Sequence, residues 1–185
     1  MVYEFTVNGR RVKTGDVIST SDGTNSIYAI GYRLLGAVIP GEVDHSVLYV
    51  GPGGLCVEAG AYGVITFTAD SSWDSERMLV ERGLLDTFRA ASSVLANRGL
   101  SAGVEEAVRS CVRTYAIECV GRPYNLNFFD PDNEGALYCS QLVYLAYKKA
   151  GIDLNVGKTG AGKWLDQVVF PQEILDNSVI IPQDE

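Results

Sequence analysis

The order of apolar and polar residues predicts a chain that mixes short strands with amphipathic helices. Residues 3–7 and 16–19 alternate or run apolar, which is typical of short strands. The clearest signal is a hairpin, in which apolar runs at 45–50 and 55–59 flank the turn Gly-Pro-Gly-Gly. Residues 63–68 are expected to add a third antiparallel strand, and residues 77–82 a fourth.

Helical spacing of apolar residues predicts the remaining elements. Ser21, Asp22 and Thr24 precede a first segment that we expect to be a capped helix ending near Gly36. Apolar positions recur every three or four residues from 102 to 120, which indicates one face of a long helix. A loop rich in Gly, Pro and Asn covers 121–135. A second strong helix over 139–150 follows and is stopped by Gly151. A short helix near 171–175 and a strand at 178–181 complete the prediction.

Helices clustered at both ends of an antiparallel sheet favour the α+β class. The 185 residues fit one domain, and no repeat, low-complexity stretch or linker divides them. We therefore expect a single domain over residues 1–185, in which residues 71–103 carry little that can be assigned.

Composition narrows the class of protein. The hydrophobic share of 46% allows a sizeable core, and a net charge of −8 argues against a nucleic-acid partner. No apolar run reaches the length of about 18 residues that would predict a transmembrane helix. The first residues lack the basic and then apolar layout of a signal peptide. We expect a cytoplasmic protein, unless a leader has been removed or a leaderless export route is used. The oligomeric state stays open.

The chain has four cysteines and one histidine. No CxxC pair occurs, so we expect neither a metal nor another cofactor, and a metal-dependent hydrolase is poorly supported. Cys56, Cys111 and Cys119 fit buried free thiols in a reducing compartment. Any Cys–His chemistry must use His45.

Cys139 has the best context for attack, because it begins a predicted helix. Unpaired amides at a helix start stabilise a thiolate and can also stabilise an oxyanion. The alternative is a small residue that packs at the helix start.

His45 opens a strand of the predicted hairpin. A register that pairs residue 50 with 55 sets His45 and Glu58 diagonally on one face, about 7 Å apart at the backbone. Glu58 could therefore orient the imidazole, as the third member of a catalytic triad does. The alternatives are a structural histidine and a solvated strand glutamate.

Taken together, these segments resemble the circularly permuted NlpC-type papain-like cysteine hydrolases, with the YiiX-like group as the nearest branch. More distant relatives of that branch include enzymes of the lecithin–retinol acyltransferase type. The blocks that carry the resemblance lie within residues 15–151: Gly-Asp-Val-Ile at 15–18, His-Ser-Val-Leu-Tyr-Val-Gly at 45–51, Val-Glu-Ala at 57–59, Gly-Arg-Pro-Tyr at 121–124 and Tyr-Cys-Ser-Gln-Leu-Val-Tyr at 138–144.

The resemblance implies a permuted papain-like α+β fold with the nucleophile at a helix N-terminus. Cys139 would be the nucleophile, His45 the general base and then acid, and Glu58 the orienting group. Tyr124 would stabilise the oxyanion together with the backbone amide of Cys139. Tyr138 is a weaker candidate that lines the cleft. The acidic residues of the loop would be rim charges or substrate contacts; they are Asp130, Asp132 and Glu134.

The function implied is a thiol hydrolase that cleaves an amide or ester through an acyl-enzyme. A cell-wall peptide or an N- or O-acylated compound is the expected substrate. Two alternatives remain open. The first is a catalytically inactive binding or scaffold domain on the same fold, and the second is a lipid acyltransferase.

Overall fold

The computed structural model describes residues 1–22, 41–84, 86–155 and 167–184 and has an α+β architecture. Six antiparallel strands form the main sheet in the order β6-β5-β4-β3-β7-β8, and β1 and β2 form a separate hairpin. In chain order the described elements are β1 (Glu4–Val7), β2 (Arg10–Lys13), β3 (Val17–Asp22), β4 (His45–Tyr49), the 3-10 turn η1 (Pro52–Gly54), β5 (Leu55–Gly60), β6 (Gly63–Thr68), α2 (Ser75–Arg82), β7 (Asp86–Ser93), α3 (Ala102–Glu118), α4 (Cys139–Lys149), α5 (Pro171–Asp176) and β8 (Val179–Ile180).

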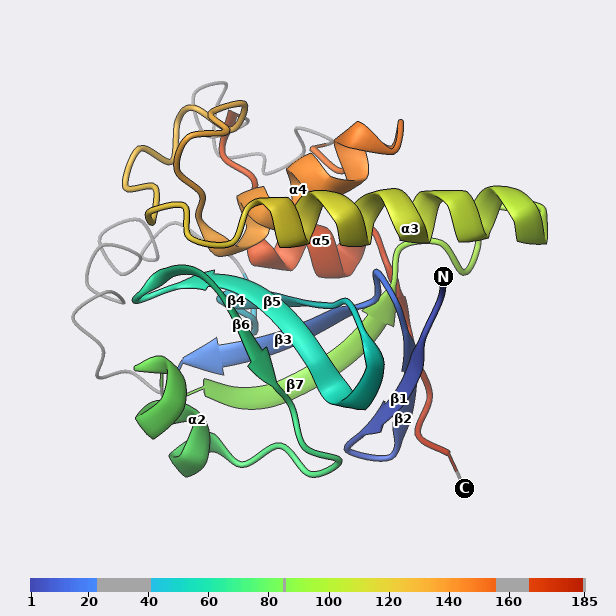
Figure 1. The fold of residues 1–185 in the computed structure, drawn as a ribbon, viewed down its shortest axis with the longest axis horizontal. Helices are drawn as coiled ribbons and strands as arrows, with labels where there is room; N and C mark the ends of the chain where they lie inside the picture. The colour runs from blue at the N-terminus through green and yellow to red at the C-terminus, as the bar shows by residue number, and fades with distance from the viewer. Residues whose placement is uncertain (23–40, 85, 156–166, 185) are drawn as a thin grey trace.

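The sheet has a different cover on each face (Figure 1). Helices α3, α4 and α5 gather on one side, whereas α2 and the β1–β2 hairpin lie on the other. Side chains alternate along a strand, so β4 contributes to both cores. Leu48 packs into the helix-side core, and Val47 and Tyr49 pack into the opposite one.

Helix α4 lies at the centre of the helix layer. Every residue from Cys139 to Tyr147 is buried, because the helix contacts α3, α5 and the strands β4 and β5. A helix that is enclosed all round is held in place by packing on every side. The first residue of α4 therefore has a fixed position relative to the sheet.

Most of the predicted elements are confirmed. In the hairpin, Leu48 pairs with Val57 and Tyr49 with Cys56, which is the register expected from the turn. The third strand forms at Gly63–Thr68 and pairs with β5 along its whole length. Four further elements are present within two residues of their expected bounds: the long helix, the helix that begins at Cys139, the short helix near the C terminus and the last strand.

The prediction of a fourth strand at 77–82 is wrong, because this segment is helix α2. Asp74 caps the helix by accepting hydrogen bonds from the backbone amides of Glu76 and Arg77, and Gly83 ends it with a left-handed backbone. An aspartate and a glycine at these positions are ordinary helix boundaries and were the overlooked signal. Strands β2 and β7 were not predicted, and β7 lies within the unassigned stretch 71–103.

The helix expected to end near Gly36 lies largely outside the described residues. Its expected start is different in one respect, because β3 continues through Ser21 to Asp22. These two residues pair with Thr87 and Asp86 of β7. They belong to the sheet, and the rest of that prediction lies outside the described residues.

Candidate functional site

Cys139 is the first residue of α4, and its thiol lies against the segment that leads into β4. Its Sγ atom is 4.0 Å from the carbonyl oxygen of Asp44, the residue before His45. The side chain of Cys139 is 1% exposed. The first turn of a helix offers backbone amides and a partial positive charge, both of which favour an anion there.

His45 begins β4 and lies between the thiol and a carboxylate. Its Nε2 atom is 2.7 Å from Oε2 of Glu58. The Cys139 side chain is near enough to the ring to raise the pKa of the imidazole through hydrogen bonding and charge. Since Nε2 faces Glu58, Nδ1 is the ring nitrogen left to the thiol. The structure thus brings Cys139, His45 and Glu58 together in one chain of contacts.

The imidazole of His45 is held in an environment that favours its charged form. Burial by itself lowers the pKa, but the hydrogen bonds to Cys139 and Glu58 and their negative charges outweigh it. The pKa of His45 is therefore raised well above its ordinary value of 6.5. A proton taken from the thiol would be retained on this ring.

Glu58 is fully buried, and an arginine compensates its charge. Burial raises the pKa of Glu58, but the charge and hydrogen bonds of Arg82 outweigh this effect, and His45 adds to them. The pKa falls to about 2 as a result. Glu58 therefore stays ionised and accepts a hydrogen bond from the His45 ring over the whole neutral range.

Arg82 is the residue of the site that the sequence analysis missed. It is the last residue of α2 and is fully buried, with Asp86 of β7 on its other side. The available signal was Glu58 itself, since a glutamate in a fully buried strand needs a cation. The sequence did not indicate which of the 15 Lys and Arg residues supplies it.

Tyr124 lies next to the chain segment that enters α4. Its backbone forms a parallel bridge with Leu137, two residues before Cys139, and the neighbouring amides and carbonyls of Pro123, Asn125 and Leu137 are hydrogen-bonded. The ring is partly buried against Phe128 and other residues of a small cluster. Tyr124 therefore lies near the N-terminal end of α4, where Cys139 is located. An oxyanion-stabilising role for its hydroxyl is a proposal.

Gln141 fixes the loop that carries Tyr124 to the start of α4. The side chain is fully buried, and its oxygen accepts hydrogen bonds from the Tyr138 amide and the Asn125 side chain. Its nitrogen donates to the carbonyl oxygens of Asp130 and Asn133. One side chain therefore holds both ends of the loop against the helix.

Three other residues named in the sequence analysis form contacts within the protein: Tyr138, Asp132 and Glu134. The Tyr138 hydroxyl accepts a hydrogen bond from the amide of Val169, and its ring packs edge-on against Phe128. Asp132 and Glu134 form ion pairs of 2.7 and 2.8 Å with the lysines at the end of α4, Lys148 and Lys149. Both carboxylates are therefore paired at the surface, and a contact with substrate stays a prediction.

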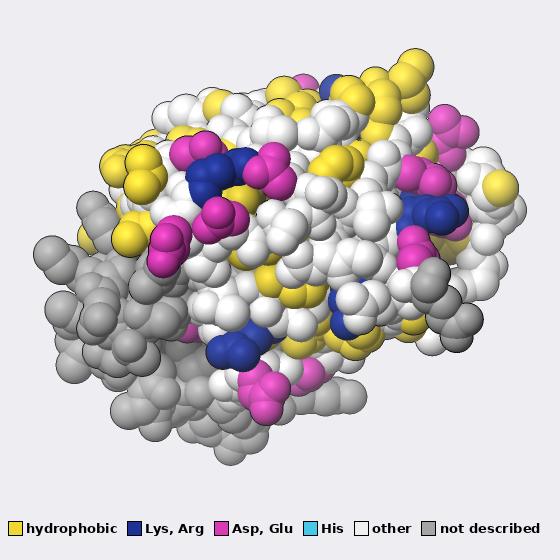
Figure 2. All heavy atoms as spheres, turned by 90° about the horizontal axis from the view of Figure 1, so that it is seen from below, with side chains coloured by type: hydrophobic (Ala, Val, Ile, Leu, Met, Phe, Trp, Pro, Cys, Tyr) yellow, Lys and Arg dark blue, Asp and Glu magenta, His cyan; other side chains and the backbone are white. Residues whose placement is uncertain are grey.

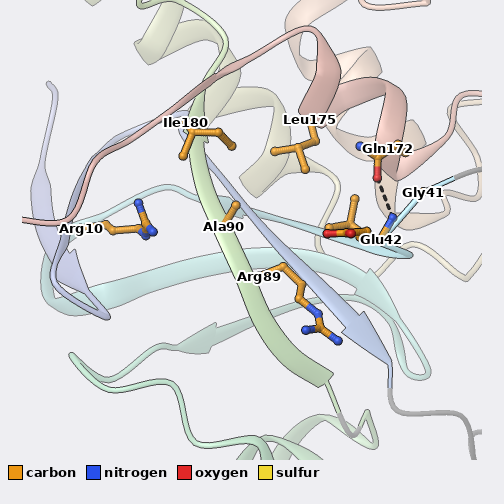
Figure 3. Close-up of a pocket in the computed structure, with 9 residues that line it drawn as sticks. Arg10, Gly41, Glu42, Arg89, Ala90, Gln172, Leu175 and Ile180 are labelled. Carbon is orange, nitrogen blue, oxygen red and sulfur yellow. Dashed lines mark hydrogen bonds between the residues drawn. The ribbon is translucent and has the colours of Figure 1, made fainter.

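The segment before His45 is anchored by α5. The amide of Glu42 donates to Oε1 of Gln172 over 3.0 Å, and this contact borders a surface cavity of about 360 Å³ (Figure 3). A side chain at Gly41 would collide with Gln172, since an added Cβ would lie 2.4 Å from it. The cavity lies between α5, β7, β8 and residues 41–43, beside the site and lined by none of its four proposed residues.

Three features of the described residues concern metal ligands, surface charge and membrane-spanning helices. Among the residues that the structure describes, no group of three or more His, Cys, Asp or Glu side chains could hold a metal ion. Acidic and basic side chains are intermingled on the face shown in Figure 2. Within the same described ranges, no helix is both long and apolar enough to cross a bilayer.

Comparison with known proteins identifies the family. Neither curated proteins nor solved structures give a match. A family model described as "permuted papain-like amidase enzyme, YaeF/YiiX, C92 family" matches residues 11–184. The match covers nearly the whole chain and includes Cys139, His45, Glu58 and Tyr124. It supports hydrolase activity of the cysteine type, and the α+β fold with an antiparallel sheet packed against helices agrees with it. The chain belongs to the permuted papain-like amidases of the YaeF/YiiX, C92 family.

Proposed function

We propose that this protein is a thiol hydrolase that cleaves an amide or ester bond with Cys139 as nucleophile. The observation that carries the proposal is the continuous series of contacts from Cys139 through His45 to Glu58. A nucleophile, a base within hydrogen-bond reach and a third group that orients the base are the parts that acyl transfer by a thiol requires.

The reaction uses each side chain in turn. His45 takes the Cys139 proton, and the sulfur attacks the carbonyl carbon to form a tetrahedral oxyanion. The Tyr124 hydroxyl and the backbone amide of Cys139 stabilise that oxyanion. The imidazolium then protonates the leaving amine or alcohol, and an acyl-enzyme remains. Water attacks the acyl group while His45 accepts a proton, which releases a carboxylic acid and restores the thiol.

The substrate we propose is a cell-wall peptide or an N- or O-acylated compound. The net charge of −8 disfavours strongly anionic partners, so a neutral peptide or an amine-bearing substrate meets less repulsion. The acyl acceptor separates two versions of the function. Incorporation of ¹⁸O from labelled water into the product acid indicates hydrolysis, whereas transfer to an added amine or alcohol indicates an acyltransferase.

Thiol labelling tests the nucleophile without a known substrate. In a Cys111→Ser background, iodoacetamide at pH 6–7 should modify Cys139 alone, as read by peptide mass spectrometry. Cys56 and Cys119 are as buried as Cys139, but they differ from it in their pKa: burial raises the pKa of the Cys56 thiol to about 12 and that of Cys119 in the same direction. They therefore serve as internal unreactive controls.

His45→Ala is the matched variant. It should abolish the preferential labelling below pH 8, because the thiol loses both its base and the cation that stabilises the thiolate. Slow and equal labelling of all the cysteines in the unmodified protein would instead favour the inactive binding or scaffold domain. A Cys139→Ser variant that retains turnover would exclude the mechanism.

A further inference from the structure

Arg82 forms a bidentate ion pair with the buried carboxylate of Glu58. Its Nε atom donates to Oε1 of Glu58 over 2.7 Å, and Nη2 donates to Oε2, the oxygen that also faces His45. Both carboxylate oxygens therefore accept a hydrogen bond from Arg82, and Oε2 also contacts the imidazole. A bidentate guanidinium fixes the plane and the direction of a carboxylate as well as its charge.

The guanidinium is itself held on its remaining sides. Nη1 and Nη2 donate to the two oxygens of Asp86, each over 3.1 Å, and the hydroxyl of Thr20 donates to Asp86 over 3.0 Å. The ring of Phe67 lies 4.1 Å from the guanidinium carbon and the ring of Trp73 lies 5.4 Å from it. Asp86 of β7, Phe67 of β6 and Trp73 thus surround the cation, and Thr20 of β3 supports Asp86.

The buried charges do not cancel among themselves. Glu58 and Asp86 contribute two negative charges and Arg82 one positive charge, and all three side chains are at most 1% exposed. The remaining negative charge faces His45, so the cluster is balanced when the imidazole carries a proton. The segment 71–103, which the sequence left without a role, supplies both Arg82 and Asp86.

We propose that Arg82 is a positioning residue of the site, which acts through Glu58 by keeping that carboxylate ionised and directed at His45. The inference rests on the proposed thiol chemistry and adds a member to it from outside the triad. Without Arg82, burial would drive Glu58 toward its protonated form. A neutral Glu58 would no longer balance the charge of the imidazolium. The thiolate–imidazolium pair would then be absent at low pH and would form only at a higher pH than in the wild-type protein.

The charged and titratable groups around Glu58 and His45 all influence the pH at which the thiolate–imidazolium pair forms. They are His45 on β4, Arg82 on α2 with Asp86 of β7 behind it, and Cys56 on the same strand, while Cys139 on α4 faces His45. The readout is the second-order rate of Cys139 alkylation by iodoacetamide from pH 4.5 to 9, in the Cys111→Ser background.

Arg82→Met should move the acid limb of this profile to higher pH by one unit or more. The rate at pH 5.5 should fall at least tenfold, with less than a threefold change at pH 8.5. Arg82→Lys keeps the charge but cannot form the bidentate contact. The acid limb of its profile should lie at a pH between those of the wild type and Arg82→Met. Arg77→Met is the matched control on α2, since Arg77 pairs with Asp70 and Glu81 and not with Glu58, and it should retain the wild-type profile.

The outcomes separate this inference from the proposed function. A folded Arg82→Met protein with an unshifted acid limb overturns the inference, whatever its overall rate, because a purely structural role would change stability and not the profile. If Arg82→Met does not fold, Arg82→Met/Asp86→Asn removes one charge of each sign, and the same shift is expected there. An unshifted limb in that double variant also overturns the inference. Failure of the proposed function looks different, because the wild-type protein itself would then show no selective labelling of Cys139.

Discussion

The Nε2 atom of His45 lies 2.7 Å from Oε2 of Glu58, although the two residues are diagonal neighbours on adjacent strands. Diagonal positions are about 7 Å apart at the backbone, which two long side chains on one face can bridge. The register of the β4–β5 hairpin is therefore enough to place the two side chains within reach of each other. Helix α4 then brings the Cys139 thiol to the other side of the ring.

The unequal roles of His45 and Glu58 predict a ranking of their variants. Proton transfer requires the imidazole itself, whereas Glu58 orients it and stabilises its charged form. His45→Ala should therefore reduce turnover, and with it the reactivity of the Cys139 thiol, more than Glu58→Ala. Glu58→Ala leaves Arg82 paired with Asp86, and the protein should therefore remain folded. Alkylation rates of Cys139 at pH 6.5 measure the ranking, and the reverse order would refute the assigned roles.

Tyr124 is predicted to act through its hydroxyl. Tyr124→Phe should lower the turnover rate by about 10²-fold, the range found when one oxyanion donor is removed. The thermal midpoint should change little, because the ring that packs beside Phe128 is kept. Tyr62→Phe, at an exposed tyrosine, is the control. An unchanged rate in Tyr124→Phe would remove this residue from the site.

The charged state of Glu58 makes part of the stability dependent on pH. Its pKa is about 2 in the folded protein against an ordinary value of 4.5, which corresponds to roughly 3 kcal/mol of folding free energy. This contribution is fully present above about pH 4.5 and is lost as the pH falls toward 2. His45 has the opposite sign, since its pKa is raised, and its contribution is present below pH 6.5 and lost as the pH rises through the raised value.

Denaturant unfolding from pH 3 to 7 measures the Glu58 contribution. The difference in unfolding free energy between wild type and Glu58→Gln should shrink as the pH falls below 4.5. A difference that stays constant down to pH 3 would mean that the ion pair with Arg82 does not form in solution.

Gln141 is predicted to be a stability residue with an effect on the site. Gln141→Leu would leave the buried Asn125 amide without its acceptor and should destabilise the protein by about 2–4 kcal/mol. Hydrogen exchange should accelerate across residues 125–133, which the side chain ties to α4. The exposed Gln183, changed to Leu, should have little effect. If the loop keeps the wild-type level of protection from hydrogen exchange, Gln141 does not hold it against α4.

The sequence by itself determined the elements whose signals are local. The hairpin register follows from a short turn between two apolar runs, and it already placed His45 and Glu58 on one face. The helix start at Cys139 follows from the apolar spacing behind it. Where the local signal was read as the wrong period, as at Arg77 and Arg82, capping by Asp74 and Gly83 overrode the expected strand.

Only the tertiary structure decided which distant groups meet. Arg82 lies 24 residues from Glu58 along the chain and on a different kind of element, and no spacing rule links them. Gln141 similarly connects α4 to a loop that has no regular pattern of its own. Burial is the reason for both contacts. A charge or an amide removed from water must find a partner, and the packed fold, not the local sequence, determines which partner is within reach.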